Sequence, residues 1–270
     1  MTITATKTVG EIAAELPGST HELEKLGIDY CCGGSRTLGE ACVQAKIPVQ
    51  EALERLDKGA AAATESGEAK GWQNQPLVDL IAHINSTHHV FVRSECPRIQ
   101  ALAQKVVEVH GKNHPELLEM QQIFSALSED LSLHLMKEEN ILFPCLLRME
   151  ESALAGEPAP PAMFGTVMNP IGMMMQEHDG AGDALRSLRF ITSEYKLPED
   201  ACASYRTLYE ALRGFEADLH QHIHLENNIL FPRAAAMEGQ HQAGTKFRQV
   251  CLAESSHLTM VCSGDTPSVS

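Results

Sequence analysis

Between residues 76 and 236, apolar side chains recur every three or four positions, which predicts long amphipathic helices packed against one another. Pro144 lies inside one of them and should kink or end it, because proline lacks the N–H that a helix interior needs. Leu, Ala, Met and Glu are plentiful and aromatic residues make up only 5% of the chain, so composition also favours an all-α fold. The four helices are expected at about 76–109, 115–150, 170–194 and 199–236.

Shorter helical stretches precede this region and predict a small helical N-terminal domain over residues 1–58. Within it, Ser19-Thr20-His21-Glu22 has the form of a capping box and predicts a helix start. Residues 59–75 are rich in Ala, Gly, Ser and Glu, which is typical of a linker. Residues 237–270 lose the helical period and are expected to form a poorly ordered tail. The bundle is therefore assigned to residues 76–236.

Adjacent cysteines, Cys31 and Cys32, are followed by Gly33-Gly34 and are expected on an exposed, adaptable turn. Two interpretations stay open: the thiols pack within a tight loop, or they form an exposed pair for redox exchange or transient metal capture. The chain has 8 cysteines but no C-x-x-C motif, and its start lacks a secretory signal. Free thiols in a reducing cytoplasm are therefore the preferred interpretation.

An eleven-residue motif occurs twice in the bundle region, once at 134–144 and again at 222–232, an offset of 222 − 134 = 88 residues without a gap. In each copy a His is followed four residues later by a Glu and then by Ile-Leu-Phe-Pro. Four residues is a little more than one helical turn, so each His-Glu pair lies on one helix face. The pairs are His134 with Glu138 and His222 with Glu226.

The surrounding apolar spacing predicts that both pairs point inward. The predicted stripes comprise Leu127, Leu131, Ile141 and Cys145 around the first pair, and Leu212, Phe215, Leu219 and Ile229 around the second. A buried carboxylate without a partner costs several kcal/mol, and a bound metal is the simplest reason to bury two of them. Imidazole with carboxylate suits iron, zinc or manganese. The alternative is a pair of buried His-Glu hydrogen bonds without metal.

Single histidines precede each pair by about the same distance. His178 lies at the centre of a clean apolar seam, 222 − 178 = 44 residues before the second pair. In the first helix, His88 and His89 belong to two competing registers, and periodicity leaves the choice nearly even. Two helical hairpins would each offer one His and one His-x-x-x-Glu. Two metals sharing Glu138 and Glu226 as bridges would use all six side chains.

Three neighbours of these candidates receive expectations of their own. His224 lies about 200° round the helix from His222 and should face away from the site. Glu139 and Glu177 adjoin proposed ligands, but solvated surface positions are expected for both.

The formal net charge of −15 makes nucleic acid and anionic membrane surfaces poor partners. The sequence also contains no apolar run of about 18 residues, so no membrane span is expected.

Three motifs together resemble the "repair of iron centres" proteins. They are Asp29-Tyr30-Cys31-Cys32-Gly33-Gly34, the His-x-x-x-Glu repeats with Ile-Leu-Phe-Pro, and Glu177-His178-Asp179, and the resemblance covers about residues 8–236. It implies a hemerythrin-like four-helix bundle with two non-haem iron ions, bridged by oxo and carboxylate groups, after a small N-terminal domain. It also selects His89 over His88. The implied iron ligands are His89, His134, Glu138, His178, His222 and Glu226.

The resemblance implies repair of iron-sulfur clusters after oxidative or nitrosative stress, with iron supplied from the bundle. The expected partners are damaged iron-sulfur proteins or cluster-assembly proteins, and Cys31 and Cys32, as candidate reactive thiols, would contact them. A homodimer stays open, as does the question of catalytic turnover. The alternatives are a protein that binds or reduces nitric oxide or oxygen at the open iron positions, and a helical scaffold without metal.

Overall fold

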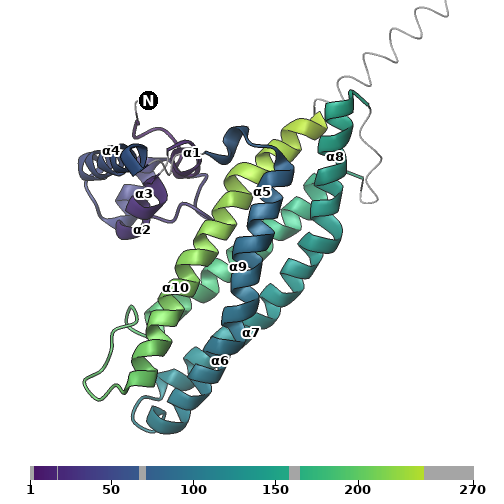
Figure 1. Cartoon of the computed structure of the whole chain (residues 1–270). Helices are drawn as coiled ribbons and strands as arrows, with labels where there is room; N and C mark the ends of the chain where they lie inside the picture. The colour runs from purple at the N-terminus through teal and green to yellow at the C-terminus, as the bar shows by residue number, and fades with distance from the viewer. Residues whose placement is uncertain (1–2, 17, 67–70, 158–164, 240–270) are drawn as a thin grey trace, which may run out of the picture.

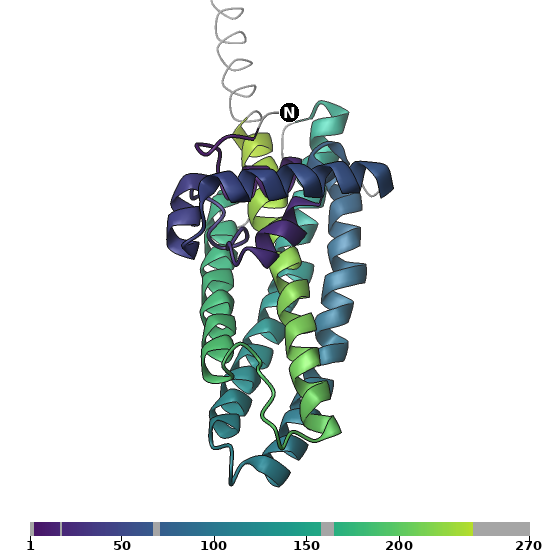
Figure 2. The same ribbon diagram turned by 90° about the vertical axis from the view of Figure 1, so that its left-hand side faces the viewer.

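The computed structural model describes residues 3–16, 18–66, 71–157 and 165–239, and every regular element within these ranges is helical, apart from one isolated bridge between Thr8 and Thr37. The all-α prediction is therefore confirmed. A small group of helices rests against one end of a long four-helix bundle (Figures 1 and 2). None of the helices in these ranges combines the length and hydropathy that a bilayer span requires.

The N-terminal domain contains α1 (Val9–Glu15), α2 (Ser19–Lys25), α3 (Leu38–Ala45) and α4 (Val49–Ser66). Its core is formed by apolar residues that include Val9, Leu23, Leu38 and Leu56. Helix α4 extends to Ser66, so residues 59–66, which were expected to be linker, are helical. A short 3-10 turn, Trp72–Asn74, leads into the bundle.

The predicted capping box at Ser19 is wrong. Helix α2 begins after Gly18 without a side-chain cap, because the Ser19 hydroxyl instead donates to the carbonyl of Leu16 at 2.6 Å, at the end of the preceding helix. Capping boxes do occur at Thr8 with Glu11 and at Thr37 with Glu40.

Four helical rods form the bundle, and three of them contain a π-helical turn. The first comprises α5 (Leu77–His83), the π turn η2 (Ile84–His89) and α6 (Val90–His110). The second comprises α7 (Glu116–Lys137), the π turn η3 (Glu138–Leu142) and α8 (Phe143–Ala155). The third is α9 (Met168–Ile191), and the fourth comprises α10 (Ala203–Leu225), the π turn η4 (Glu226–Leu230) and a helical continuation to residue 239. Residues 240–270, most of the predicted tail, lie outside the described residues.

The π turn corrects one predicted core position. Ile141 was placed on the buried stripe, but it is 52% exposed, whereas Leu142 is 1% exposed. Both residues lie in the π turn Glu138–Leu142, which contains one residue more than an α turn, and within it Leu142 rather than Ile141 faces the core. The π turn also accommodates Pro144 at the start of α8 without ending the helical rod.

The bundle has two apolar clusters with a polar layer between them. The cluster farther from the π turns includes Val92, Phe124 and Phe215, and the other includes Ile84, Phe143 and Ile229. The π turns η2, η3 and η4 contain His89, Glu138 and Glu226, and they also contribute apolar side chains to the second cluster.

Phe215 provides a test of the packing in the larger cluster. It is 1% exposed and its ring centroid lies 5.3 Å from that of Phe124. We expect Phe215→Ala to lower the free energy of unfolding by about 3–5 kcal/mol, because it leaves a cavity in a packed core. Phe190→Ala is the control, since Phe190 is 84% exposed and its removal should change stability by less than about 0.5 kcal/mol. Urea unfolding measures both; similar losses for the two variants would contradict the assigned core.

Candidate metal centre

Six side chains from the four rods converge in the polar layer of the bundle. Each is at most 3% exposed. They form two overlapping groups, one with His89 and His222 and the other with His134 and His178, and both groups share Glu138 and Glu226. Within each group the candidate donor atoms all lie within 4.8 Å of one another. The structure thus brings together all six residues that the sequence and the resemblance selected.

Each glutamate directs its two oxygens to different histidines. Oε1 of Glu138 lies 3.2 Å from Nε2 of His134, and its Oε2 lies 3.4 Å from Nε2 of His89. Oε1 of Glu226 lies 3.3 Å from Nε2 of His222, and its Oε2 lies 3.1 Å from Nε2 of His178. Each carboxylate therefore lies between the two donor groups, with one oxygen facing each.

Six of these donor atoms are buried without a hydrogen-bond partner in the described part of the chain. They are both oxygens of Glu138 and of Glu226, together with Nε2 of His89 and of His222. Nε2 of His134 lies 3.1 Å from Nε2 of His178. Buried polar atoms are rarely left without partners, because each costs about 1–3 kcal/mol or more if charged. Donors that converge in this way fit a bound cation, and carboxylate with imidazole is a donor set typical of iron or zinc.

Outer residues hold three of the four histidines through Nδ1. His89 donates to Glu139 at 2.7 Å, His134 to Glu177 at 2.9 Å, and His178 to the side-chain oxygen of Asn227 at 2.8 Å, if each ring carries its proton on Nδ1. This tautomer leaves Nε2 free to bind a metal. The sequence predicted solvated surface positions for Glu139 and Glu177. In the structure both carboxylates instead hold histidines of the cluster.

Basic residues keep both outer carboxylates ionised. The Arg93 guanidinium donates to Glu139 at 2.7 Å and, with His89, lowers the pKa of that carboxyl against the effect of its partial burial. Glu177 is partly buried, which would raise its pKa, but contacts with Lys137 and His134 lower the pKa overall. A carboxylate in this position makes the imidazole a better electron donor.

His222 has a different environment. Instead of a carboxylate, the ring of His88 stacks on it, with centroids 5.7 Å apart and planes 9° apart, and Nδ1 of His222 has no partner among the described residues. His88 is itself fixed by a 3.0 Å contact between its Nδ1 and Asp218. The competition between His88 and His89 in the sequence thus has a structural explanation: both are buried beside the cluster, but only His89 contributes a donor atom to it.

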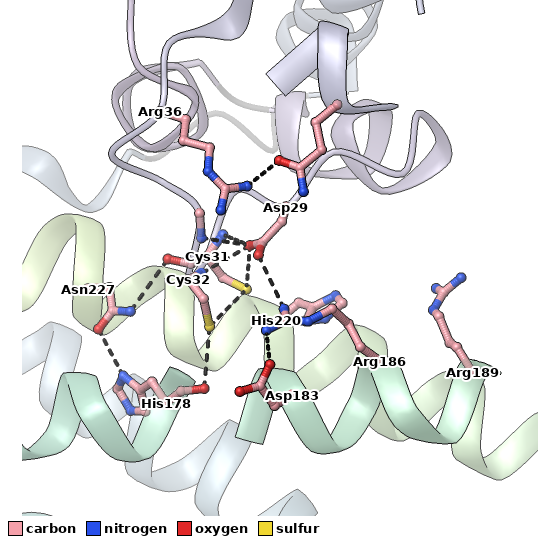
Figure 3. A network of polar contacts seen from close by, with 12 residues as sticks. Asp29, Cys31, Cys32, Arg36, His178, Asp183, Arg186, Arg189, His220 and Asn227 are labelled. Atoms are coloured by element: carbon pink, nitrogen blue, oxygen red, sulfur yellow. Dashed lines mark hydrogen bonds and ion pairs between the residues drawn. The ribbon is translucent and has the colours of Figure 1, made fainter. Parts of the chain in front are cut away.

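Residues 29–34, which carry Cys31 and Cys32 and are called the thiol turn below, lie against the bundle beside this cluster. The Cys32 thiol donates to the backbone carbonyl of His178 at 3.4 Å, and the Asn227 amide donates to the carbonyl of Cys31 at 3.4 Å while its oxygen accepts from His178 (Figure 3). Asp29 caps the turn by accepting from the backbone N–H groups of Cys31, Cys32 and Gly33 at 3.0–3.1 Å. Asn227 therefore connects the thiol turn to a candidate ligand.

The two thiols are not equally accessible, which corrects the predicted exposed turn. Cys31 is buried and Cys32 is partly buried, and their sulfur atoms lie 3.9 Å apart. The pKa of the Cys31 thiol is raised well above its usual range, because the thiol contacts Cys32, is buried and lies beside the Asp29 carboxylate. Both cysteines line an open cavity of about 620 Å³ between the N-terminal domain and the α9 and α10 side of the bundle.

His224 occupies the other side of helix α10. It faces away from the six-residue cluster, as predicted, but it is buried rather than solvated. Its ring packs against Tyr30 of the N-terminal domain at a centroid distance of 5.4 Å, and burial lowers the pKa of His224 to about 4. His224 is thus part of the contact between the two domains.

A second opening borders the cluster directly. A groove of about 430 Å³ lies between α7 and α9, and His134 and His178 are among its lining residues. Its walls are mainly apolar or small residues, with three charged residues, Asp130, Lys137 and Glu177, among them; the apolar and small ones are Ile123, Ala126, Leu127, Leu131, Leu133, Gly180, Ala181 and Ala184.

Comparison with known proteins agrees with this architecture. Residues 80–234 match the hemerythrin HHE cation binding domain, and residues 5–60 match ScdA_N, a domain of unknown function (DUF542). The fold and the site therefore define a hemerythrin-like cation-binding bundle. Over 228 residues, 84% of this chain and 96% of the relative, the sequence is 35% identical to the iron-sulfur cluster repair protein YtfE of Pectobacterium atrosepticum. Proteins of the same name from Yersinia pseudotuberculosis and Yersinia pestis are 36% identical with the same coverage. The chain belongs to this hemerythrin-like family of iron-sulfur cluster repair proteins.

The close fit between the domains yields a prediction for Cys31. A Cβ added at Gly34 would lie 2.5 Å from Oδ1 of Asn228 and 3.0 Å from the carbonyl oxygen of Tyr30. We expect Gly34→Ala to loosen the docked turn and to speed alkylation of Cys31 by about tenfold, equivalent to about 1.4 kcal/mol of docking free energy. Peptide mass spectrometry after timed alkylation measures the rate at this one cysteine.

Gly71→Ala is the matched control, because nothing lies within 4 Å of a Cβ at that position. Its alkylation rate at Cys31 should equal that of the unmodified chain. Equal rates in Gly34→Ala and Gly71→Ala would show that the turn is not held by this contact.

Proposed function

We propose that this chain is a non-haem iron protein that repairs iron-sulfur clusters damaged by oxidative or nitrosative stress, and that it does so by supplying iron. The observation that carries the proposal is the set of buried donor atoms of Glu138, Glu226 and their histidines, which converge without partners in the described part of the chain. The names of relatives that share 35–36% identity, iron-sulfur cluster repair proteins, support the choice of process.

We infer two iron ions, held by His89, His134, Glu138, His178, His222 and Glu226. Support comes from the two donor groups that share both glutamates, since each carboxylate offers one oxygen to each group. Bound iron would supply exchangeable metal and sites for small ligands. With four imidazoles and only two carboxylates, the donor set is softer than that of carboxylate-rich di-iron bundles, which carry four carboxylates.

The thiol turn would take part in delivery to a damaged cluster. Cys32 borders the 620 Å³ cavity and contacts the backbone of His178. A client that enters this cavity would therefore be separated from a proposed ligand only by Cys32. The partly buried Cys32 is the thiol that we expect to contact the client. Cys31, held protonated beneath it, would become available only if the domain contact opens. The clients would be iron-sulfur proteins with incomplete clusters.

Nitric oxide or oxygen binding is the second candidate. The groove between α7 and α9 has His134 and His178 in its lining, and its mainly apolar walls suit a small, weakly polar diatomic molecule. This groove supports access to the proposed centre, and reduction of the bound gas stays a prediction from the open coordination positions of the proposed irons.

The repair proposal is tested by adding the iron-loaded protein to an iron-sulfur enzyme whose cluster has been damaged by hydrogen peroxide or nitric oxide. We expect it to restore activity faster than the same amount of free ferrous iron. Glu138→Gln should bind less iron and lose most of this effect, because the amide removes one shared negative charge from the buried site. Iron content is measured on the same samples.

Glu129→Gln is the control, because it makes the same chemical change at an exposed position on the same helix. It should retain both iron and repair activity. Reactivation by the unmodified protein no better than by free iron would contradict the repair function. Equal iron content in the two variants would contradict the proposed centre.

A further inference from the structure

A second cluster of metal-binding residue types lies at the other end of the bundle. His110 ends α6, His114 lies in the turn before α7, and Asp200 lies in the connection between α9 and α10. Both views show these two connections together at the end of the bundle remote from the N-terminal domain (Figures 1 and 2). This cluster is separate from the proposed iron centre.

The three side chains meet with the spacing of metal ligands. One donor atom from each lies within 4.8 Å of the other two, and Nε2 of His114 lies 2.9 Å from Oδ1 of Asp200. Donor atoms that bind one zinc ion at about 2.0–2.2 Å are about 3–4 Å apart, so small shifts of these side chains would bring all three onto one ion. The set of two imidazoles and one carboxylate comes from two connections that are distant in sequence.

His110 supplies the observation that a simple ion pair does not explain. It is only 8% exposed, and its Nε2 is buried without a hydrogen-bond partner in the part of the chain that the structure describes. An ion pair between His114 and Asp200 would leave this nitrogen unsatisfied, at a cost typical of a buried polar group. A cation bound by the cluster would provide an electron-pair acceptor beside it.

His114 is oriented as a metal ligand would be. Its Nδ1 lies 3.1 Å from Oε1 of Glu116, which leaves Nε2 facing Asp200. The same arrangement holds His89 and His134, whose Nδ1 atoms contact Glu139 and Glu177. Carboxylate contacts of this kind fix the tautomer and orientation of metal-binding imidazoles.

We propose that His110, His114 and Asp200 bind one divalent transition-metal ion of the zinc and ferrous class. Three protein ligands leave at least one coordination position for water, and Asp200 is exposed, so the ion can enter from solvent. The bound ion links the α6–α7 turn to the α9–α10 connection and thereby stabilises the far end of the bundle. Its occupancy does not depend on the iron centre.

The test uses the full iron-loaded chain and buffered Zn²⁺ as the probe. Zinc and iron are counted by elemental mass spectrometry after desalting, and thermal unfolding is recorded with and without zinc. We expect the unmodified chain to gain about one zinc per chain with no loss of iron, and its unfolding midpoint to rise. Asp200→Asn should weaken zinc binding at least about tenfold, since even outer residues of metal sites contribute that much.

Glu199→Gln is the matched control, because it removes the same charge at the neighbouring exposed residue. It should bind zinc and respond in thermal unfolding like the unmodified chain. His114→Gln gives a second variant that removes a ligand without touching buried His110, and it should behave like Asp200→Asn. Equal zinc affinity in Asp200→Asn and Glu199→Gln would overturn the proposal, as would zinc uptake matched by loss of iron.

Discussion

The structure depends on the burial of two carboxylates at the centre of a helical bundle. Glu138 and Glu226 are fully buried, and among the described residues none of their four oxygens has a hydrogen-bond partner. Two negative charges in a low-dielectric interior require compensating positive charge. Four surrounding imidazoles place their nitrogens 3.1–3.9 Å from these oxygens, and cations bound among them would complete the compensation. The two apolar clusters on either side exclude water and hold the carboxylates in place.

The sequence repeat explains both the symmetry of the site and its departures from symmetry. Glu139 in the first copy corresponds to Asn227 in the second, and each holds the Nδ1 of a histidine on another rod. Asn227 also contacts the backbone of Cys31, so its replacement of a glutamate coincides with docking of the N-terminal domain on that half. The residue before each single histidine also differs between the two halves. Glu177, before His178, contacts Nδ1 of His134, whereas His88, before His89, stacks on the ring of His222. The two halves therefore surround the proposed ions with different charge.

Most of the fold and the identity of the six central residues followed from the sequence, because helical periodicity and a gapless repeat report directly on which face is buried. The π turns did not, since the local sequence of Glu138–Leu142 has the same apolar pattern in either helix type. This is why Ile141 was assigned to the core in place of Leu142. The roles of Glu177 and of buried Cys31 depend on contacts between distant segments, which single-helix patterns do not contain. The resemblance, not the periodicity, distinguished His89 from His88.

X-ray absorption spectroscopy of the iron-loaded chain, with iron content measured on the same sample, tests the central claim most directly. Two irons that share the carboxylates of Glu138 and Glu226 should give about two irons per chain and iron–iron scattering at about 3.5–4 Å, the spacing usual for two-metal sites. A chain that retains a single iron without an iron neighbour, or that holds none after desalting, would contradict this account.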